Sequence, residues 1–376
     1  AALAQASLAQ ATRARPLPRV FPEPKRQLAP RAPVAMPLRT KFTELAGIEH
    51  PVLCGGMQYA GYAELAAAVS NAGGLGTVSA LTQGSPDRLR AEIQKTRSLT
   101  SKPFGVNFTI LPAMVTPDYY IVVQAAIDEG IKIVQTAGNS PDRIKMKDGR
   151  SLLKMLKDAG IFVIHKCMSV KHALAAEKGG VDMISLGAWE YGGHIGNDEI
   201  THWVSQPLAG IKLKIPFLVA GASYHGSQLA AALAMGASGV ELGTAFMATQ
   251  ECPIKQGIKD AIVGADEHST ILLLRKVGNV GRFYKNDLTK KVKEIEDHMD
   301  KPDFAPLAPY MTGKRNYASL RETGDPDEGA WTMGMGAGFI TRIPTCKEFL
   351  TEFVDTAVEI IQGRMSQAVV VPASRL

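Results

Sequence analysis

A histidine set among glycines is the segment of this chain best suited to chemistry. Residues 192–196 read Gly-Gly-His-Ile-Gly and follow an apolar run, residues 183–186, of the kind that fills a buried parallel strand. Glycines let a backbone approach a ligand closely, and parallel α/β folds place their chemistry at the carboxyl ends of strands. The segment is therefore either a binding loop formed by Gly192, Gly193 and His194, or a tight strand-to-helix loop with an incidental histidine.

A lysine, Lys166, follows the end of another apolar run, residues 161–165. At the mouth of a barrel, a lysine can form a covalent imine with a carbonyl substrate. It can also place a positive charge beside a bound anion. A lysine that simply reaches solvent would give the same sequence, so the residues alone leave these three possibilities open.

Small residues at two further strand ends predict a phosphate site. Residues 217–220 lead into Gly221 and Ala222, and a helix is expected to open near residue 226. Residues 240–244 end in Gly243 and Thr244. Small residues expose backbone N–H groups, and a helix N-terminus favours a dianion. Barrels often bind a phosphate after strands seven and eight, so a phosphate-bearing ligand is expected here.

The ends of the first and third predicted strands could hold a flat ring. Gly55, Gly56 and Met57 follow the first strand, where glycines admit a ring against the backbone and the sulfur can contact it. Asn107 ends the third strand and carries an amide that both donates and accepts hydrogen bonds. The eight histidines and the carboxylates show no metal-ligand spacing, so we predict no metal site.

The elements that would position these residues alternate regularly. Apolar runs of strand length alternate with stretches of helical spacing, such as 62–72, 87–96, 120–128, 152–159, 169–178 and 227–235. The eight runs are residues 51–54, 75–79, 104–109, 131–136, 161–165, 183–186, 217–220 and 240–244. Eight parallel strands close a (β/α)8 TIM barrel. The competing architecture is a doubly wound open sheet, but it favours Gly-x-Gly-x-x-Gly after the first strand, where this chain has Gly-Gly-Met-Gln.

This alternation of strand and helix patterns divides the chain into four parts. Residues 1–37 are an arginine- and proline-rich extension, and residues 38–249 are the expected barrel. Residues 250–335 break the alternation and are expected to form an inserted lid or small second lobe. Residues 336–376 contain an amphipathic helix, from 346 to about 365, that is expected to pack back on the barrel.

Composition restricts the class of protein. The chain has 376 residues with 45% hydrophobic content, and no apolar run is long enough to span a membrane. Its four cysteines are widely spaced and predict neither a disulfide framework nor a zinc site. Five of the six net positive charges lie in residues 1–36. The body is close to neutral, which argues against a nucleic-acid partner.

The extension itself predicts a location. It is rich in arginine and poor in acids, as organelle transit peptides are, which favours the mitochondrial matrix. The alternative is a disordered tail on a cytoplasmic protein. In the first case residues 1–36 could attach the protein to a larger organellar complex or support a homodimer.

Taken together, these segments resemble the nitronate monooxygenase (2-nitropropane dioxygenase) family of FMN-dependent barrel enzymes. The likeness runs from about residue 38 to 365 and is carried by residues 55–58, 71–75, 103–107, 165–167 and 192–196, with Gly221, residues 243–244 and Phe246. It implies FMN with its phosphate at Gly221, Ala222, Gly243 and Thr244, and its ring near Gly55, Gly56, Met57 and Asn107. The resemblance also implies that Lys166 stabilises the anionic reduced flavin, and that His194 binds or deprotonates the substrate.

Longer strings are similar to a bacterial branch of the family that acts as an NADH:quinone reductase. They are residues 193–200, 249–253, 266–270 and 324–327, with Trp331. Three residues depart from the pattern expected: Ala220, Ala222 and Thr323. The resemblance thus implies either nitronate oxidation by O2 or hydride transfer from NADH to a quinone. The alternatives are a non-catalytic FMN-binding accessory subunit and an aldolase-like barrel that uses Lys166 as an imine.

Overall fold

The computed structural model describes residues 38–110 and 118–368. The predicted N-terminal extension lies outside the described residues. Within them, the alternation read from the sequence produces one eight-stranded parallel sheet in the order β1-β9-β8-β6-β5-β4-β3-β2. Its strands are β1 Val52–Cys54, β2 Gly76–Ser79, β3 Phe104–Ile110, β4 Ile133–Gly138, β5 Phe162–Cys167, β6 Met183–Gly187, β8 Phe217–Ala220 and β9 Val240–Leu242.

The sheet closes between β1 and β2, the strands at the two ends of this order. The Leu75 N–H donates to the Val52 carbonyl, and the Cys54 N–H donates to the Leu75 carbonyl, both at 2.9 Å. The predicted (β/α)8 barrel is therefore confirmed, and the open doubly wound sheet is wrong. Strand β9 ends at Leu242, two residues earlier than the predicted run of residues 240–244, because Gly243 caps a helical turn that begins at Thr244.

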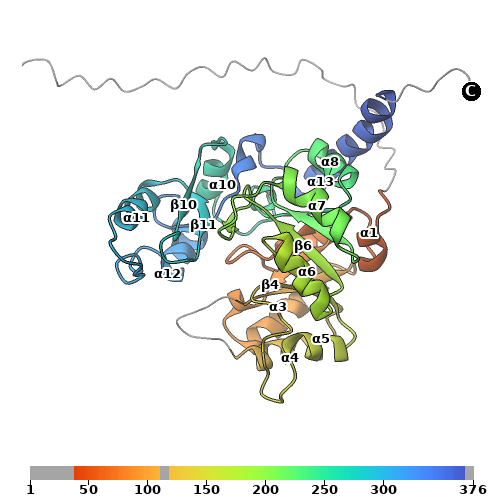
Figure 1. Cartoon of the computed structure of the whole chain (residues 1–376), viewed down its shortest axis with the longest axis horizontal. Coiled ribbons are helices and arrows are strands. Elements are labelled where there is room, and N and C mark those ends of the chain that lie inside the picture. The colour runs from red at the N-terminus through yellow and green to blue at the C-terminus, as the bar shows by residue number, and fades with distance from the viewer. Residues whose placement is uncertain (1–37, 111–117, 369–376) are drawn as a thin grey trace, which may run out of the picture. The chain divides into compact units, whose positions relative to one another are not determined.

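Helices follow the strands and cover the outside of the barrel; Figure 1 shows α3 to α6 on the outer side of the strands. Glycines in the left-handed region end several of them, such as Gly130 and Gly160 at φ 68° and Gly180 at φ 101°. The helices are α1 Lys41–Ala46, α2 Ala63–Asn71, α3 Pro86–Leu99, α4 Tyr119–Asp128, α5 Leu152–Asp158, α6 Val170–Gly179, α7 His202–Lys212, α8 Gly226–Ala234, α9 Thr244–Met247, α10 Gln256–Val263, α11 Asp287–Asp297, α12 Gly313–Tyr317 and α13 Cys346–Glu359. Among the described residues, no helix is long and apolar enough to cross a membrane.

The barrel interior changes character along its length. At one end, inward-facing apolar side chains form a cluster that includes Ile133, Ile164 and Met183, with Phe42 of α1 packed against them. Because side chains alternate across a strand, the residue two positions further along each strand also faces inward. Those residues are polar: Gln135, Lys166 and Ser185. The polar layer therefore lies toward the carboxyl ends, where barrel chemistry is expected.

A second, antiparallel sheet forms outside the barrel. Its order is β10 (Thr270–Leu273), β11 (Gly281–Tyr284) and β7 (Gly193–His194). The expected glycine loop is thus partly a short strand, because β11 supplies an edge to which it pairs, with His194 opposite Gly281. Apolar residues of β10, β11 and α11 pack together beside this sheet, in a cluster that includes Leu273, Phe283 and Val292.

The last helix packs closely on α8. It runs through α13 and continues as a π-helical turn, Ile360–Met365. Its residues Leu350, Phe353 and Val354 join the main core. A side chain added at Gly226, which begins α8, would collide with the Phe353 carbonyl, so a glycine is needed for this contact.

Candidate functional site

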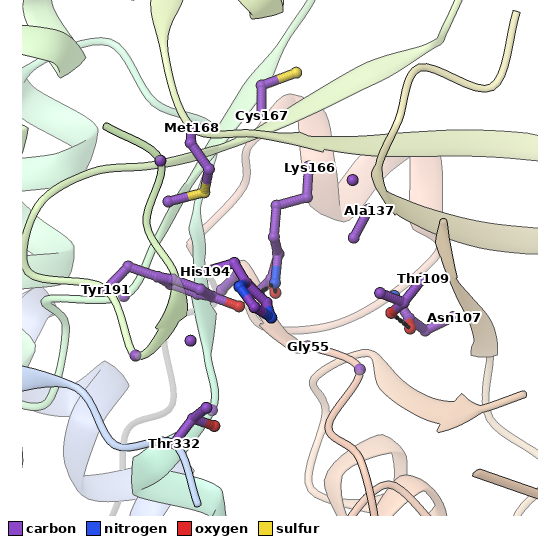
Figure 2. Close-up of a pocket in the computed structure, with 18 of the residues that line it drawn as sticks. Gly55, Asn107, Thr109, Ala137, Lys166, Cys167, Met168, Tyr191, His194 and Thr332 are labelled. Carbon is purple, nitrogen blue, oxygen red and sulfur yellow. Dashed lines mark hydrogen bonds and ion pairs between the residues drawn. The ribbon is translucent and has the colours of Figure 1, made fainter. Parts of the chain in front are cut away.

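A cavity of about 670 Å³ opens at the carboxyl ends of the strands (Figure 2). All but one of the residues that the sequence predicted for a site line it: Gly55, Gly56, Met57, Asn107, Lys166, Gly192, Gly193, His194, Gly221, Gly243 and Thr244. Ala222 does not line the cavity, and its backbone adopts a left-handed φ of 55° directly after Gly221 at 82°. This volume lies in the range of cofactor and ligand pockets.

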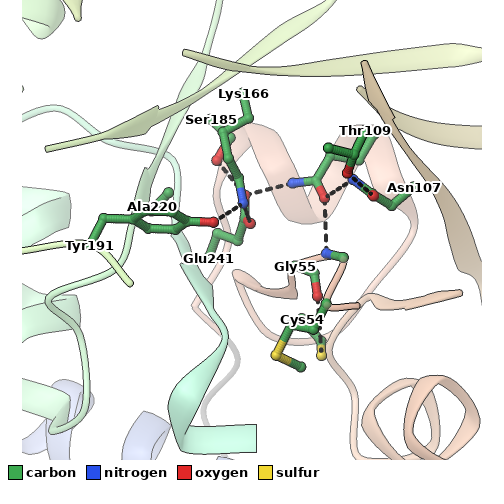
Figure 3. Close-up of polar contacts among 12 residues, drawn as sticks. Cys54, Gly55, Asn107, Thr109, Lys166, Ser185, Tyr191, Ala220 and Glu241 are labelled. Carbon is green, nitrogen blue, oxygen red and sulfur yellow. Dashed lines mark hydrogen bonds and ion pairs between the residues drawn. The ribbon is translucent and has the colours of Figure 1, made fainter. Parts of the chain in front are cut away.

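Lys166 does not reach solvent. Its side chain is 8% exposed and forms an ion pair with Glu241, which is 2% exposed (Figure 3). Its Nζ also donates to the Tyr191 hydroxyl at 2.9 Å. Burial by itself lowers the pKa of Lys166, but Glu241 and Tyr191 more than offset this effect and hold the pKa well above its ordinary value. A lysine held protonated is a poor nucleophile, so this environment favours an electrostatic role over an imine.

Glu241 is the centre of a buried hydrogen-bond network. Gln135 Nε2 donates to Glu241 Oε2 at 2.6 Å, and the Ser185 hydroxyl donates to the same oxygen. Gln135 Oε1 in turn accepts from Asn107 Nδ2 at 3.0 Å and from the Gly56 N–H at 3.1 Å. The network therefore connects the charged pair to the two segments, at residues 56 and 107, that were predicted to hold a ring.

This network leaves no room for a side chain at two of the predicted glycines. A Cβ at Gly55 would collide with the Glu241 carboxylate, and one at Gly56 would collide with the Asn107 side chain. The close approach of the loop after β1 to these buried polar groups therefore requires glycine at both positions.

Sequence reasoning missed Glu241, Gln135, Ser185 and Tyr191. A signal existed for the first of these, because Glu241 lies inside an apolar run of strand length, where a carboxylate needs a partner. That partner, Lys166, lies three strands away in the barrel order and could not be assigned without the fold.

His194 is a half-buried histidine with one ring nitrogen that makes no hydrogen bond to the described chain. It lines the cavity, and its Nδ1 is buried with no hydrogen-bond partner in the described chain. Burial lowers the pKa of His194 below its ordinary value of 6.5, although a hydrogen bond with the Asn279 backbone opposes the shift. The ring is therefore neutral at pH 7 and able to accept a proton. Figure 2 shows Lys166, Tyr191 and His194 converging on one space.

The corner predicted for a phosphate is only partly free to bind one. The Gly221 N–H already donates to the Glu241 carbonyl at 3.0 Å, so it cannot serve a ligand. The Thr244 hydroxyl accepts from the Gly334 N–H at 3.1 Å and is also hydrogen-bonded to Tyr224. Tyr224 is half-buried beside this hydroxyl, and burial raises the pKa of Tyr224 to about 12, so its O–H stays protonated. Together with the glycine floor and Asn107, these donors fit a flat heterocycle that carries an anionic group.

A smaller chamber of about 250 Å³ joins the main cavity beside His194. Its walls carry no charged residue. Six residues line both spaces: Met57, Gln58, His194, Met247, Asn279 and Thr332. The remaining walls of the chamber are mostly apolar and include Leu274, Phe283, Phe304, Met311, Leu320, Ala330 and Trp331.

The outer part of the main cavity carries the guanidinium of Arg143 and the imidazole of His172. Arg143 and His172 line it and are exposed to solvent. Asn139 and Asn197 line the same cavity and add neutral hydrogen-bonding groups. An anionic part of a ligand would be favoured near this opening.

The fold and this cavity define a class, the (β/α)8-barrel enzymes with their site at the carboxyl ends of the strands. The chain belongs to the nitronate monooxygenase family, whose model matches residues 39–356. Its membership makes it an oxidoreductase, as the sequence resemblance implied.

The alignments with several similar proteins cover nearly the whole length of each of them. A dehydrogenase of Mycobacterium tuberculosis that acts on a 5-hydroxy-7a-methyl-1-oxo-octahydro-indene-4-carboxyl-CoA is 34% identical, over 87% of this chain and 98% of the relative. A probable nitronate monooxygenase of Staphylococcus saprophyticus is 29% identical, over 79% and 91%. FabK from Thermotoga maritima is a similar solved structure, with a TM-score of 0.78 and 31% identity over 88% of this chain and all of that one.

Proposed function

We propose that this protein is an FMN-dependent oxidoreductase whose FMN occupies the main cavity. The observation that carries this proposal is the convergence of the predicted cofactor residues on one cavity of suitable size. Gly55, Gly56 and Met57 would support the ring, and Asn107 would meet its polar edge. The phosphate would take donors from Gly243 and Thr244, with Gly221 setting the turn, whereas Ala222 lies outside the cavity.

FMN would carry out the transfer of an electron pair. The residues of the protein would set the charge around the ring and accept the proton of the substrate. Lys166 would favour negative charge on the ring, and Glu241 would limit that effect because the two charges are paired. Neutral His194 would accept a proton from a carbon acid through its free nitrogen. The Tyr191 hydroxyl, which accepts from Lys166, would stay oriented toward the same space.

For the substrate we propose first a nitronate, oxidised with O2, in keeping with the family and with a neutral histidine beside the ring. The uncharged chamber next to His194 would take an apolar arm of this substrate. A volume of about 250 Å³ equals that of roughly eight waters, enough for a medium alkyl or alicyclic group. Residues 250–335, which supply most of the chamber's apolar walls, would act as the lid.

A second candidate is a substrate that carries phosphates. The positive charge of Arg143 at the cavity opening favours it, and so does the similarity to a dehydrogenase of a CoA-linked compound. NADH is also such a substrate, because it carries phosphates. It would give a hydride to FMN, and a quinone would then accept the electrons. This candidate uses the cofactor site described above and differs only in the substrate.

The cofactor proposal has a direct test. Purified protein should be yellow and should release FMN, and not FAD, on denaturation. Turnover is then compared with an alkyl nitronate plus O2, with NADH plus a quinone, and with a CoA thioester. Protein that is colourless and cannot be reconstituted with FMN would rule out the site assignment. FMN binding without any turnover would favour the accessory-subunit alternative.

The role of His194 is tested by replacing it with asparagine. Removing a general base typically costs about 10²–10⁴-fold in rate, so His194→Asn should slow turnover of the parent nitroalkane, the carbon acid, by that order while FMN content is unchanged. His268→Asn is the matched control, since His268 is exposed and outside the cavity. If both variants turn over at the wild-type rate, residues 192–196 are only a tight structural segment.

A further inference from the structure

Helix α7 presents its large apolar residues to solvent. Trp203 is 77% exposed, Ile211 is 81% exposed and Val204 is 56% exposed. Leu208 on the same helix and Ile200 just before it are exposed as well. With about 3.6 residues per turn, positions 203, 204, 207, 208 and 211 fall on one face of the helix. We call these five exposed apolar residues, Ile200, Trp203, Val204, Leu208 and Ile211, the α7 stripe.

The buried face of α7 is polar or small, which is the reverse of an ordinary surface helix. It consists of His202, Ser205, Gln206 and Ala209. Two of these residues are bonded to neighbouring elements: His202 Nε2 lies 3.0 Å from the Ala220 carbonyl of β8, and Gln206 Nε2 donates to the Ala232 carbonyl of α8 at 2.7 Å. These contacts fix the rotation of the helix, so the α7 stripe cannot turn inward.

The exposed apolar area of the stripe indicates that it binds a partner. A buried aromatic side chain covers ~150–250 Å², so the stripe amounts to an apolar patch on the order of 500 Å². Monomeric proteins seldom leave a contiguous patch of that size uncovered unless it binds something. Stable interfaces bury about 800 Å² per partner, with an apolar centre and a polar rim. The stripe has the size of such a centre.

Charges at the two ends of the stripe identify the partner as a second copy of this chain. Asp198 and Glu199 are exposed just before α7, where Glu199 also pairs with Arg275 of the same chain at 2.7 Å, whereas Lys212 and Lys214 are exposed at and just beyond its end. A two-fold axis through the middle of the stripe pairs two α7 helices in antiparallel orientation. That arrangement places the acidic end of each copy near the basic end of the other, and it brings Trp203 opposite Leu208.

We propose that the protein is a two-fold symmetric dimer formed through the α7 stripe, with α7 packed antiparallel on its counterpart. The interface is isologous, because each copy contributes the same residues. Apolar contact supplies the affinity, while the charged ends fix the orientation. The site at the carboxyl ends of the strands is complete within one chain and does not depend on this contact.

The test compares full-length wild-type protein with Trp203→Lys and Ile211→Lys by analytical ultracentrifugation. Both residues are exposed, so the variants should fold and bind FMN normally. Loss of a central tryptophan should weaken the dimer by at least about tenfold. Leu99→Lys is the matched control, since Leu99 is an exposed apolar residue on α3. Wild-type protein that is monomeric, or a dimer that Trp203→Lys leaves unchanged, would overturn the proposal.

A cross-link tests the orientation. The four native cysteines are buried, so Leu208→Cys adds an accessible thiol close to the proposed axis. Packed helix axes lie ~8–10 Å apart, within reach of a short bis-maleimide. We expect a cross-linked dimer from Leu208→Cys and none from Leu99→Cys. Absence of the Leu208→Cys product would overturn the antiparallel arrangement, as would coverage of the stripe by residues 1–37 or 369–376 of the same chain.

Discussion

The pairing of Lys166 with Glu241 changes what Lys166 can do for a flavin. A lone buried ammonium would strongly favour the anionic reduced ring, but Glu241 offsets that charge. We expect Glu241→Gln to raise the midpoint potential of bound FMN, because Lys166 then acts unopposed. Lys166→Met should lower the potential and should also destabilise the fold by about 3–5 kcal/mol, since it leaves the Glu241 carboxylate buried without a positive charge beside it.

The double variant separates these effects. Lys166→Met combined with Glu241→Gln removes both charges and should restore most of the stability lost in Lys166→Met. Spectroelectrochemical titration measures the potentials, and urea denaturation measures the free energy of unfolding. Equal potentials in all four proteins would mean that the pair does not act on the cofactor.

His165 gives a prediction about pH. It is 2% exposed, its Nδ1 lies 2.8 Å from the Thr136 hydroxyl, and burial lowers its pKa to about 4, with Asp142 opposing the shift. The unfolded chain binds this proton near pH 6.5, so the contribution to stability is complete above that pH and is lost as pH falls toward 4. We expect up to about 3 kcal/mol of such loss from this group.

The measurement is the free energy of unfolding at several pH values between 4 and 7. His165→Asn should show a smaller fall across this window than the wild type, whereas His268→Asn should not change it. Parallel curves for wild type and His165→Asn would contradict a neutral, buried His165.

At the scale of elements, the sequence predicted the barrel well. Its strands are short apolar runs, and glycine caps such as Gly130 and Gly160 mark the helix ends, so the signals are local. The residues that the sequence missed depend on distant contacts. Glu241 and Gln135 are 106 residues apart, and the pairing of His194 with Gly281 joins segments that no local pattern relates.

The contact of α13 with α8 can be tested at one glycine. Gly226→Ala should cost about 1–3 kcal/mol, because the added methyl would collide with the Phe353 carbonyl and force the helices apart. Gly363→Ala is the matched control, since nothing lies within 4 Å of a methyl at that position. It should be neutral or slightly stabilising. Thermal and urea unfolding compare the two, and equal stabilities would show that α13 is not tightly docked.

The lid segment gives a prediction about substrate size. Met311→Trp would fill the chamber beside His194, while Met365→Trp places the same residue far from it. Burial of each methylene contributes ~0.8 kcal/mol, or about three- to fourfold in kcat/KM. Wild type and Met365→Trp should therefore improve along a series of 1-alkyl nitronates, and Met311→Trp should lose this gain. A series with no dependence on chain length in wild type would remove the chamber from the substrate site.

At the scale of the whole molecule, the open question is the role of residues 1–37. The family match begins at residue 39, and the barrel closes without the extension. Deleting residues 1–36 should therefore leave FMN binding, turnover and the α7 dimer unchanged. Loss of FMN or of folding in the truncated protein would show that the extension belongs to the barrel.

Location needs a separate experiment. The extension carries five arginines and one lysine against a single acid, Glu23, a balance that favours import into the negatively charged mitochondrial matrix. Residues 1–37 fused to a fluorescent protein should direct it to mitochondria. The same fusion with the five arginines changed to glutamine should stay in the cytosol, because it keeps length and proline content but loses the charge. Diffuse fluorescence from the unchanged fusion would instead favour a cytoplasmic protein with a charged tail.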